Sequence, residues 1–336
     1  MKAIGADPRS AFRNWMVVGG AMLLLLSILL GISTGAVQVG IGEILDSLRW
    51  TQLAGENQQI IYNIRIPRVM VGALVGINLA LAGVILQGVL RNPLADPGIV
   101  GVTSGAGLAA MVVLILWPER TFIVPVVAFA GALAATGLVF LLSWQNGIHP
   151  LRLILAGVAV SAFFGGGMSA LMVFHSDKVQ GTVNWLAGGF QGRSWDHVRM
   201  IMPYTLLGLA GALYGSRYLT ILNLGDDAAK GLGVPVERVR FFFIILAALL
   251  AASAVSVAGL LGFVGLIVPH LTRLLVGVDS EYMLPCAAAF GAILVVVADT
   301  AARVIFRPVE IPVGVLMAFL GAPFFLHLLR KGVRHK

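Results

Sequence analysis

The chain has 336 residues, of which 59% are hydrophobic and 11% charged, and its mean hydropathy is +0.95. Because charged residues make up about 25% of a typical soluble domain, this composition excludes a soluble globular protein and indicates a polytopic membrane protein. The net charge of +8 does not predict a nucleic-acid partner, since the basic residues are spread over short loops and both ends of the chain. The single cysteine, Cys286, lies in an apolar run, where it can form no disulfide within the chain and is expected to pack in the interior.

Ten apolar segments predict ten membrane-spanning helices in one domain over residues 1–336. A spanning helix needs about 20 apolar residues. The segments that reach or approach this length are 15–37, 67–89, 98–117, 122–143, 151–174, 199–220, 238–259, 261–276, 282–302 and 312–329. The predicted fold class is therefore all-α. The uncharged run from Trp15 to Gly42 is too long for the apolar region of a signal peptide, so we expect an uncleaved first helix.

The eighth segment is expected to follow a break in the backbone. The run from Phe241 to Thr272 contains no Asp, Glu, Lys or Arg. As one helix it would be roughly 48 Å long, whereas the hydrocarbon core is about 30 Å thick. The run must therefore bend or turn back, and it can do so at Gly259, Gly262, Gly265 or Pro269. Interrupted segments of this kind often line a transport pathway.

One polar segment, residues 225–240 with the sequence GDDAAKGLGVPVERVR, separates the sixth and seventh predicted helices. Its charged side chains would together cost roughly 15–20 kcal/mol at the bilayer centre, so the segment is expected to lie in water. The glycines and the proline within it predict a short helix from about Asp226 to Leu232, a turn, and a new helix near Val236. The segment is either a platform on which another protein pushes or an ordinary polar loop, and its spacing alone favours the loop.

The distribution of basic residues predicts that both termini and the 225–240 segment are cytoplasmic. With the N-terminus inside, 14 of the 23 Lys and Arg residues fall on the inner side and 9 on the outer side. Cytoplasmic loops carry the excess of Lys and Arg in membrane proteins. The chain is therefore expected to cross a lipid bilayer many times; the location implied by the family resemblance described below is a bacterial plasma membrane.

Signatures of catalysis, metal binding and nucleotide binding are absent from the sequence. It has no HExxH motif, no cysteine pair and no Gly-Lys dipeptide, which excludes a GxxxxGK[ST] phosphate loop. We therefore expect no catalytic residue, metal or cofactor on this chain, and any ATP must be hydrolysed by another polypeptide. Charged residues are scarce near the middle of the predicted spans, which argues against a stand-alone secondary transporter or channel. An intramembrane enzyme would likewise lack candidate residues.

Arginines gather at the predicted outer ends of the second and ninth helices. Arg65 and Arg68 flank Pro67. Arg303 follows Asp299 by four residues, so Asp299 and Arg303 share a helix face and are expected to pair. These arginines either anchor helix ends among lipid headgroups or present positive charge to an acidic partner outside. Position alone slightly favours anchoring.

Several stretches together resemble one family, the iron-chelate and cobalamin permeases of binding-protein-dependent ABC importers. They are IRIPRVMVGALVG at 64–76, GVILQGVLRNPLADPGIVGVTSGAG at 83–107, NWLAGGF at 184–190, GDDAAKGLGV at 225–234, GLLGFVGLIVPHLTRLLVG at 259–277, ADTAARVI at 298–305 and PVEIPVGVLMAFLGAPFFLHLL at 308–329. The resemblance covers nearly the whole chain after about residue 60. Only the N-terminal helix and the loop over residues 40–60 lack a recognisable match.

The resemblance implies the permease fold of type II ABC importers, with ten helices per subunit. It implies a second permease subunit, either a copy or a relative, two ATPase subunits that bind ATP and magnesium, and an extracytoplasmic solute-binding protein. The cargo it implies is a ferric siderophore or related metal chelate, with cobalamin or haem as the alternative. Recognition of the chelate would reside largely in the binding protein.

The resemblance also assigns roles to particular residues. The residues implied to couple to the ATPase are Asp226, Asp227, Ala228, Lys230, Gly231, Leu232 and Gly233. Those implied to dock the binding protein are Arg65, Arg68 and Arg303. The inner loop near a cytoplasmic gate is implied to include Asn92, Pro93, Asp96 and Pro97.

Overall fold

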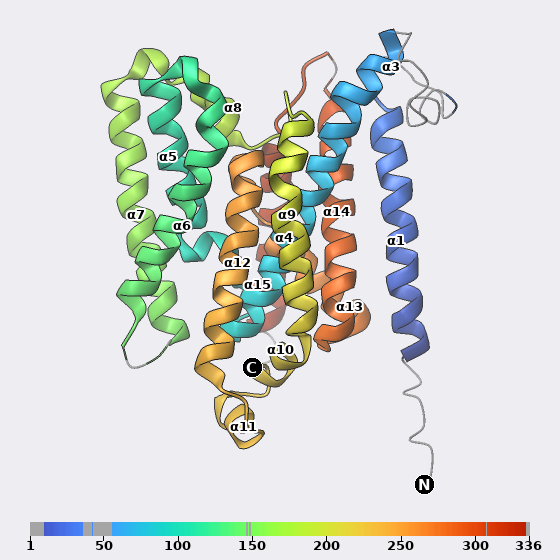
Figure 1. Cartoon of the computed structure of the whole chain (residues 1–336), viewed down its shortest axis with the longest axis vertical. Coiled ribbons are helices and arrows are strands. Elements are labelled where there is room, and N and C mark those ends of the chain that lie inside the picture. Colours follow the sequence, from blue (N-terminus) through green and yellow to red (C-terminus); the bar gives the residue numbers. More distant parts are fainter. Residues whose placement is uncertain are drawn as a thin grey trace.

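The computed structural model describes residues 10–35, 42, 56–145, 147, 149–306 and 308–333, and the regular elements in this part of the chain are all helices (Figure 1). The long helices are α1 (Ser10–Ser33), α4 (Ile66–Leu90), α5 (Val102–Leu116), α6 (Val124–Ser143), α7 (Pro150–Phe174), α9 (Trp195–Tyr214), α12 (Val236–Ala258), α13 (Val264–Val276), α14 (Ser280–Val304) and α15 (Val313–Val333). Each overlaps one predicted segment, so the all-α prediction is confirmed.

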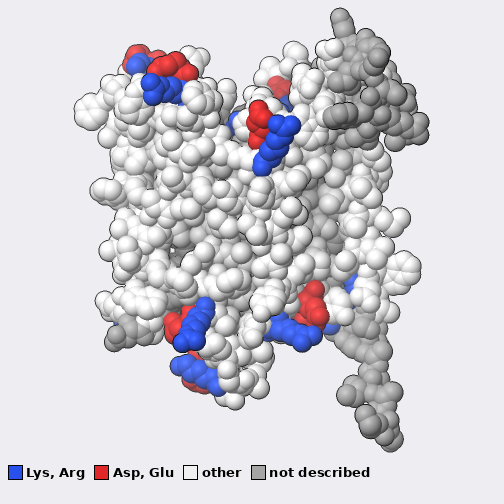
Figure 2. All heavy atoms as spheres, viewed as in Figure 1, with Lys and Arg blue, Asp and Glu red and all other residues white. Residues whose placement is uncertain are grey.

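Short helices connect the long ones. They are α3 (Glu56–Ile60), η1 (Ile61–Arg65), η2 (Pro97–Val100), η3 (Pro118–Ile123), η4 (Ser176–Lys178), α8 (Gln180–Ala187), α10 (Ser216–Leu222) and α11 (Asp226–Gly231). Among the described residues, 6 helical stretches are long and apolar enough to cross a membrane, and three shorter apolar helices accompany them. On the face shown in Figure 2, charged side chains gather toward the two ends and leave a wide uncharged belt between them, as a bilayer requires.

Helix α4 forms the centre of the bundle. In its most hydrophobic stretch, 89% of the residues are buried inside the protein. The helix packs against α9, α12, α13 and α14. Small residues let these helices approach closely, since a Cβ on Gly83 would collide with the backbone of Gly265 in α13. The buried Asn78 donates from Nδ2 to Ser253 Oγ of α12 at 2.9 Å. A helix enclosed on all sides in this way must be apolar around its whole circumference, as α4 is.

The predicted break between the seventh and eighth helices lies at Gly259. Helix α12 ends at Ala258, Gly259 adopts a positive φ of 74°, and α13 begins at Val264. Pro269, which was predicted as another possible break, instead lies inside α13. A proline cannot donate to the carbonyl four residues before it, here that of Gly265. Gln87 Nε2 of α4 donates to that carbonyl at 3.1 Å instead, so the helix continues and gains a bond to α4.

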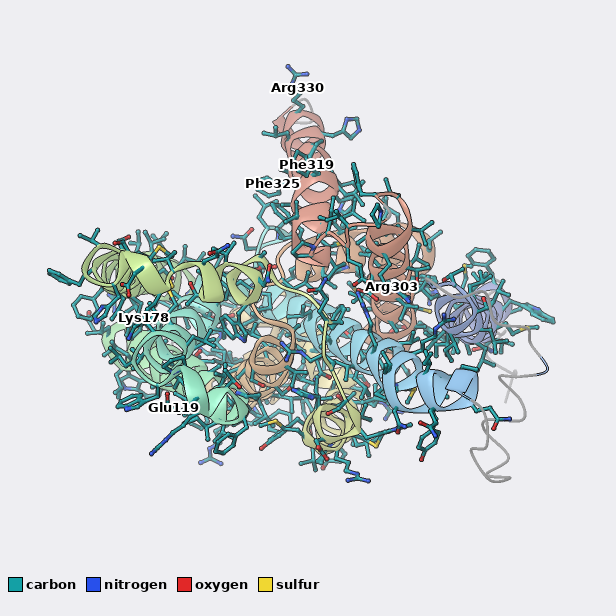
Figure 3. The ribbon with its side chains drawn as sticks, turned by 90° about the horizontal axis from the view of Figure 1, so that it is seen from above. Glu119, Lys178, Arg303, Phe319, Phe325 and Arg330 are labelled. Atoms are coloured by element: carbon teal, nitrogen blue, oxygen red, sulfur yellow. The ribbon has the colours of Figure 1, made fainter. Side chains whose placement is uncertain are left out.

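Three long helices lie at the periphery. In the most hydrophobic stretches of α1 and α7, only 22% and 17% of the residues are buried by the rest of the chain. Helix α1 is joined to α14 at its first turns, where Arg13 lies 3.7 Å from Asp279 and over the ring of Tyr282. Seen along the bundle, α15 leans outward, and the part of it from Phe319 to Arg330 projects away from the other described helices (Figure 3).

Some boundaries differ from the sequence prediction. The sixth predicted segment, 199–220, is two helices, because α9 ends at Tyr214 and α10 begins at Ser216. The short helix α8 was not predicted, since its eight residues are too few to show a clear hydrophobic period. The prediction that Cys286 packs in the interior is confirmed.

Candidate functional site

Helix α11 projects beyond the ends of the long helices and forms an exposed elbow between α10 and α12 (Figure 1). The backbone before it turns at Gly225, whose φ of 109° favours glycine. Pro235 lies immediately before α12. The predicted helix, turn and second helix start are therefore confirmed to within about one residue.

Most residues predicted to couple to an ATPase lie on the exposed side of this elbow. Leu232 is 62% exposed and so is available for contact with another protein. Ala229, by contrast, is fully buried and holds the elbow against the bundle. The exposed members of the predicted set are Asp227, Ala228, Lys230, Gly231, Leu232 and Gly233.

Asp226 differs from the rest of the set because its carboxylate faces the protein. Its Oδ1 lies 2.8 Å from Nη2 of Arg240 on α12 and 3.4 Å from Nη2 of Arg91 at the end of α4. Arg240 is only 2% exposed and also lies 3.4 Å from Glu237. Because buried guanidinium groups need acidic partners, Asp226 joins α11 to both helices. The two adjacent aspartates of the elbow therefore have different surroundings.

The loop that follows Arg91 contains the residues predicted to lie near a cytoplasmic gate. Arg91 itself adopts a left-handed conformation with φ 48° and ends α4. Asn92 Oδ1 accepts from the N–H of Leu94 at 2.9 Å, and Asp96 Oδ1 accepts from Gly98 N–H at 2.8 Å. The second contact caps η2, which begins at Pro97. Pro93 is exposed within the same turn.

This loop is attached to the start of α13 through Gln87. Gln87 Nε2 donates to the carbonyls of Ala95 and Gly265, at 3.4 and 3.1 Å, and its Oε1 accepts from Arg273 Nη2 at 3.1 Å. A Cβ on Gly265 would lie 3.0 Å from Asp96 Oδ2. The loop, α4 and α13 thus form one hydrogen-bonded unit next to the Arg91–Asp226 pair.

At the opposite end of the bundle, two of the three predicted docking arginines are buried against α1. Arg65 and Arg303 are each 6% exposed. Arg65 Nη1 donates to the carbonyls of Ile32 and Ser33 at 3.0 and 3.3 Å. Arg303 donates to Gly31 and Thr34 carbonyls at 3.0 and 3.1 Å. These carbonyls end α1 and have no partner within the helix, so the guanidinium groups act as its C-terminal cap.

The third arginine, Arg68, binds two carboxylates. Its Nε and Nη2 contact the two oxygens of Asp299 at 3.1 and 3.0 Å, which is the bidentate geometry that guanidinium groups favour. Its Nη1 donates to Glu310 Oε2 at 2.8 Å. Partial burial opposes ionisation of Glu310, but the hydrogen bond and charge of Arg68 outweigh it and lower the pKa of that carboxyl.

The predicted pairing of Asp299 with Arg303 is confirmed, since Asp299 Oδ2 lies 3.2 Å from Arg303 Nε. The docking role of the three arginines stays a prediction, and the headgroup alternative does not describe Arg65 or Arg303, whose side chains point into the protein. Sequence analysis missed Arg91 and Glu310 as partners within these clusters. The pairing of Arg303 with Asp299 could be predicted because the two residues are four apart on one helix. Pairs between helices that are distant in the sequence show no such spacing.

The whole arrangement matches one protein family. Residues 23–331 match the model of the FecCD transport family. The chain belongs to that family.

Relatives and a solved structure agree with this assignment. The Fe(3+)-citrate import system permease protein YfmE of Bacillus subtilis is 40% identical over 314 residues, which cover 92% of this chain and 94% of the relative. The cobalamin import system permease protein BtuC of Halobacterium salinarum is 43% identical over 274 residues, covering 81% and 74%. A solved structure described as an inward-facing, metal-chelate type ABC transporter superposes with a TM-score of 0.85 at 32% identity, covering 95% of this chain and 99% of the other.

The FecCD family consists of permease subunits of ABC importers, in which a separate ATPase hydrolyses ATP. This chain is therefore a multi-pass membrane permease and not an enzyme. The resemblance noted in the sequence is confirmed, and so is the type of fold it implied.

Proposed function

We propose that this chain is the permease subunit of an importer that carries a ferric siderophore or a related metal chelate into the cytoplasm. The observation that carries the proposal is the elbow at α11, which exposes Asp227, Lys230 and Leu232 while Asp226 remains joined to α4 and α12. A protein that docks on the exposed side can push on the bundle through the buried side. The ATP and magnesium needed for that push would be bound by the ATPase.

The contacts of Asp226 support a route from this motor to the pathway. Arg91 ends α4 and precedes the loop from Asn92 to Pro97, which is bonded to α13 through Gln87. A displacement of α11 would therefore reach the loop through the Asp226–Arg91 salt bridge, and would reach α13 through the two hydrogen bonds of Gln87. On this proposal the loop belongs to the cytoplasmic gate.

Orientation belongs to the same proposal. Placing α11 in the cytoplasm places the start of α1 there too, because both lie at the same end of the bundle (Figure 1). Several of the basic residues behind the orientation prediction lie outside the described residues; they are Lys2, Arg9, Arg49, Arg307, Arg334 and Lys336.

At the outer end, we assign docking of a solute-binding protein to the surface around Arg68. Its side chain is 12% exposed and that of Glu310 is 39% exposed. Arg65 and Arg303 would support this surface by holding α1 in place. Carboxylates of a docked partner would compete with Glu310 for Arg68, which makes docking sensitive to charge.

A second permease subunit would cover the apolar faces of α7 and α15. Phe163 of α7 and Phe319 of α15 are 73% and 75% exposed. Helix α15 also projects from the bundle (Figure 3). A pathway between two such subunits would be walled by small and apolar residues, which hold a passing chelate weakly. The second subunit is either a copy of this chain or a relative.

The cargo assignment rests on the relatives, one of which is named for Fe(3+)-citrate and another for cobalamin. A strain lacking this chain should lose uptake of radiolabelled ferric siderophore or ferric citrate, while uptake of labelled cobalamin stays at the wild-type level. Loss of cobalamin uptake alone would assign the alternative cargo. Uphill transport by the purified chain in vesicles without an ATPase would contradict the proposal.

A further inference from the structure

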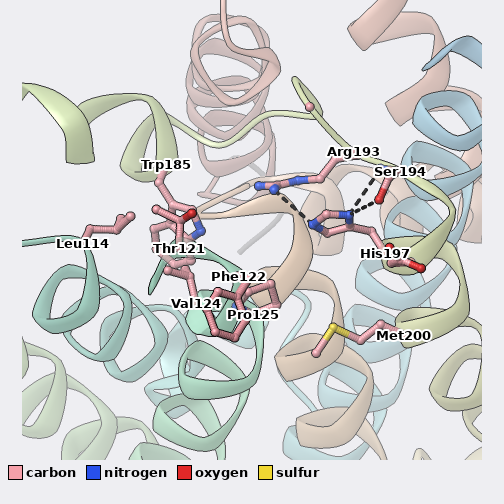
Figure 4. Close-up of a pocket in the computed structure, with 12 residues that line it drawn as sticks. Leu114, Thr121, Phe122, Val124, Pro125, Trp185, Arg193, Ser194, His197 and Met200 are labelled. Carbon is pink, nitrogen blue, oxygen red and sulfur yellow. Dashed lines mark hydrogen bonds between the residues drawn. The ribbon is translucent and has the colours of Figure 1, made fainter. Parts of the chain in front are cut away.

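A pocket of about 560 Å³ opens at the end of the bundle opposite α11, between the η3–α6 region, α8 and the start of α9 (Figure 4). Its size is within the usual range for small-molecule sites. Apolar and aromatic side chains form much of the wall, among them Phe122, Trp185 and Met200. The charged and ionisable groups of the lining, Arg193, Asp196 and His197, all come from the segment before α9 and its first turn, while Thr121 of η3 adds a hydroxyl group. Trp185 and Arg193 also line a neighbouring pocket that includes Arg68 and Asp299, but neither of them is bonded to that arginine cluster in the described residues.

Arg193 brings an uncompensated positive charge into this pocket. Its guanidinium reaches over the pocket toward Trp185 (Figure 4), and its Nε is buried with no hydrogen-bond partner. Burial lowers the pKa of Arg193 to about 10, so the group is still cationic at neutral pH. Asp196, the acid at the rim, is 85% exposed and lies 3.4 Å from Arg199 instead. Among the described residues no carboxylate pairs with Arg193, although buried charges in proteins are normally paired.

His197 adds a second donor that faces the same point. The backbone N–H of Ser194 donates to His197 Nδ1 at 3.2 Å, which occupies the lone pair of that nitrogen. A neutral imidazole then carries its proton on Nε2. His197 Nε2 lies 3.4 Å from Arg193 Nη1. In this tautomer the N–H groups of Arg193 and His197 face each other, and the oxygen of an anion would accept from both.

We propose that this pocket binds an organic anion through a carboxylate group placed between Arg193 and His197. A guanidinium binds a carboxylate through parallel hydrogen bonds, and the imidazole N–H would supply a further one. The apolar wall formed by Phe122, Trp185 and Met200 would receive the body of the ligand. That wall disfavours inorganic phosphate, and the nearby charge of Asp196 disfavours a second anionic group on the ligand.

The test is a binding titration on the full chain in nanodiscs of phosphatidylcholine. The probe is 2-naphthoate, and its neutral analogue 2-naphthamide and inorganic phosphate serve as comparison ligands. Arg193→Gln should weaken naphthoate binding at least about tenfold, because charged hydrogen bonds are the strong ones. Arg199→Gln, at a side chain that is 79% exposed beside the same pocket, should change it less than about twofold.

Other results would overturn the proposal. They are naphthamide binding as tightly as naphthoate, phosphate binding in place of naphthoate, or equal losses in the two arginine variants. Loss of binding when phosphatidylglycerol is added to the nanodiscs would assign the pocket to a lipid headgroup and would also overturn it. If Arg193→Gln does not yield folded protein, the fallback variant is Arg193→Lys, which keeps the positive charge but lacks the two parallel N–H groups of a guanidinium. Naphthoate binding at wild-type strength in Arg193→Lys would exclude bidentate pairing.

Discussion

Asp226 and Arg240 face each other at 2.8 Å, and the guanidinium of this pair is 2% exposed. The same carboxylate lies 3.4 Å from Arg91 at the end of α4. One side chain of the exposed elbow thus touches both the helix that follows it and the helix that precedes the loop from Asn92 to Pro97. We expect this contact to transmit force rather than to bind the ATPase.

Replacement of Asp226 should therefore separate the two roles of the elbow. Asp226→Asn should leave the ATPase bound but lower cargo-stimulated transport severalfold, because Arg91 and Arg240 lose their shared counter-ion. Some loss of stability, about 1–2 kcal/mol, should accompany it, since Arg240 keeps Glu237 as a partner. Uptake per molecule of ATP hydrolysed, measured in proteoliposomes, checks the prediction. Asp227→Asn is the matched control, and equal uncoupling in both variants would remove the distinction between these aspartates.

Changes on the exposed side of the elbow should act on docking. Gly231→Pro or Asp227→Arg should reduce co-purification of the ATPase while the spanning helices stay folded. The proline removes a backbone N–H in the last turn of α11, and the arginine reverses a charge on its surface. Pull-down from detergent extracts gives the bound fraction, and thermal unfolding reports the fold. A wild-type amount of bound ATPase would argue against docking at α11.

The cap on α1 makes a prediction about the outer end. Arg65→Gln should lower the stability of the chain by about 1.5–3 kcal/mol, because it removes charged hydrogen bonds to the last carbonyls of α1. The melting temperature in detergent and proteolysis between α1 and α4 measure the effect. The comparison is Arg199→Gln, which alters an exposed arginine at the same end. An unchanged melting temperature in Arg65→Gln would mean that the cap contributes little.

Close packing of glycines predicts a contrast between two alanine variants. Gly83→Ala should destabilise the bundle by about 1–3 kcal/mol, since the new methyl group would meet the backbone of Gly265. Gly137→Ala in α6 has nothing within 4 Å and should raise stability by up to about 1 kcal/mol through helix propensity. Melting temperatures of the two variants, measured in one detergent, should therefore shift in opposite directions.

The Arg68–Glu310 pair predicts a dependence of stability on pH. The pKa of Glu310 is lowered from its ordinary value of 4.5, so the pair contributes stability above that value and loses it as the pH falls through the lower, folded-state pKa. The difference in melting temperature between wild type and Glu310→Gln should be constant above about pH 5 and shrink below 4.5. A difference that persists at the lowest pH would exclude ionic pairing as its source.

Much of the fold could be predicted because bilayer thickness constrains helix length. The ten segments and the break at Gly259 follow from counting uncharged residues and locating glycine. The path of residues 180–194 could not be predicted, because α8 is short and its residues have no distinct period. Pro269 was misleading because the compensating donor, Gln87, comes from a distant helix.

Some features of the functional residues could also be predicted from the sequence, and others could not. The exposed elbow was recognisable from its charges between two apolar runs. The different surroundings of Asp226 and Asp227 were not, since they depend on Arg91, which lies 135 residues earlier in the chain. The attachment of Arg65 and Arg303 to α1 was also not predictable, because their partners on that helix are backbone carbonyls, which leave no trace in side-chain identity.

Arginines fasten α1 to α14 near both of its ends, through Arg13 with Asp279 at one end and Arg303 with the Gly31 carbonyl at the other. Two attachments so far apart prevent the pair from pivoting against each other. Spectroscopic labels placed on the two helices should then report a constant separation throughout a transport cycle. That separation would serve as an internal ruler against which movements of α7, α11 and α15 can be measured.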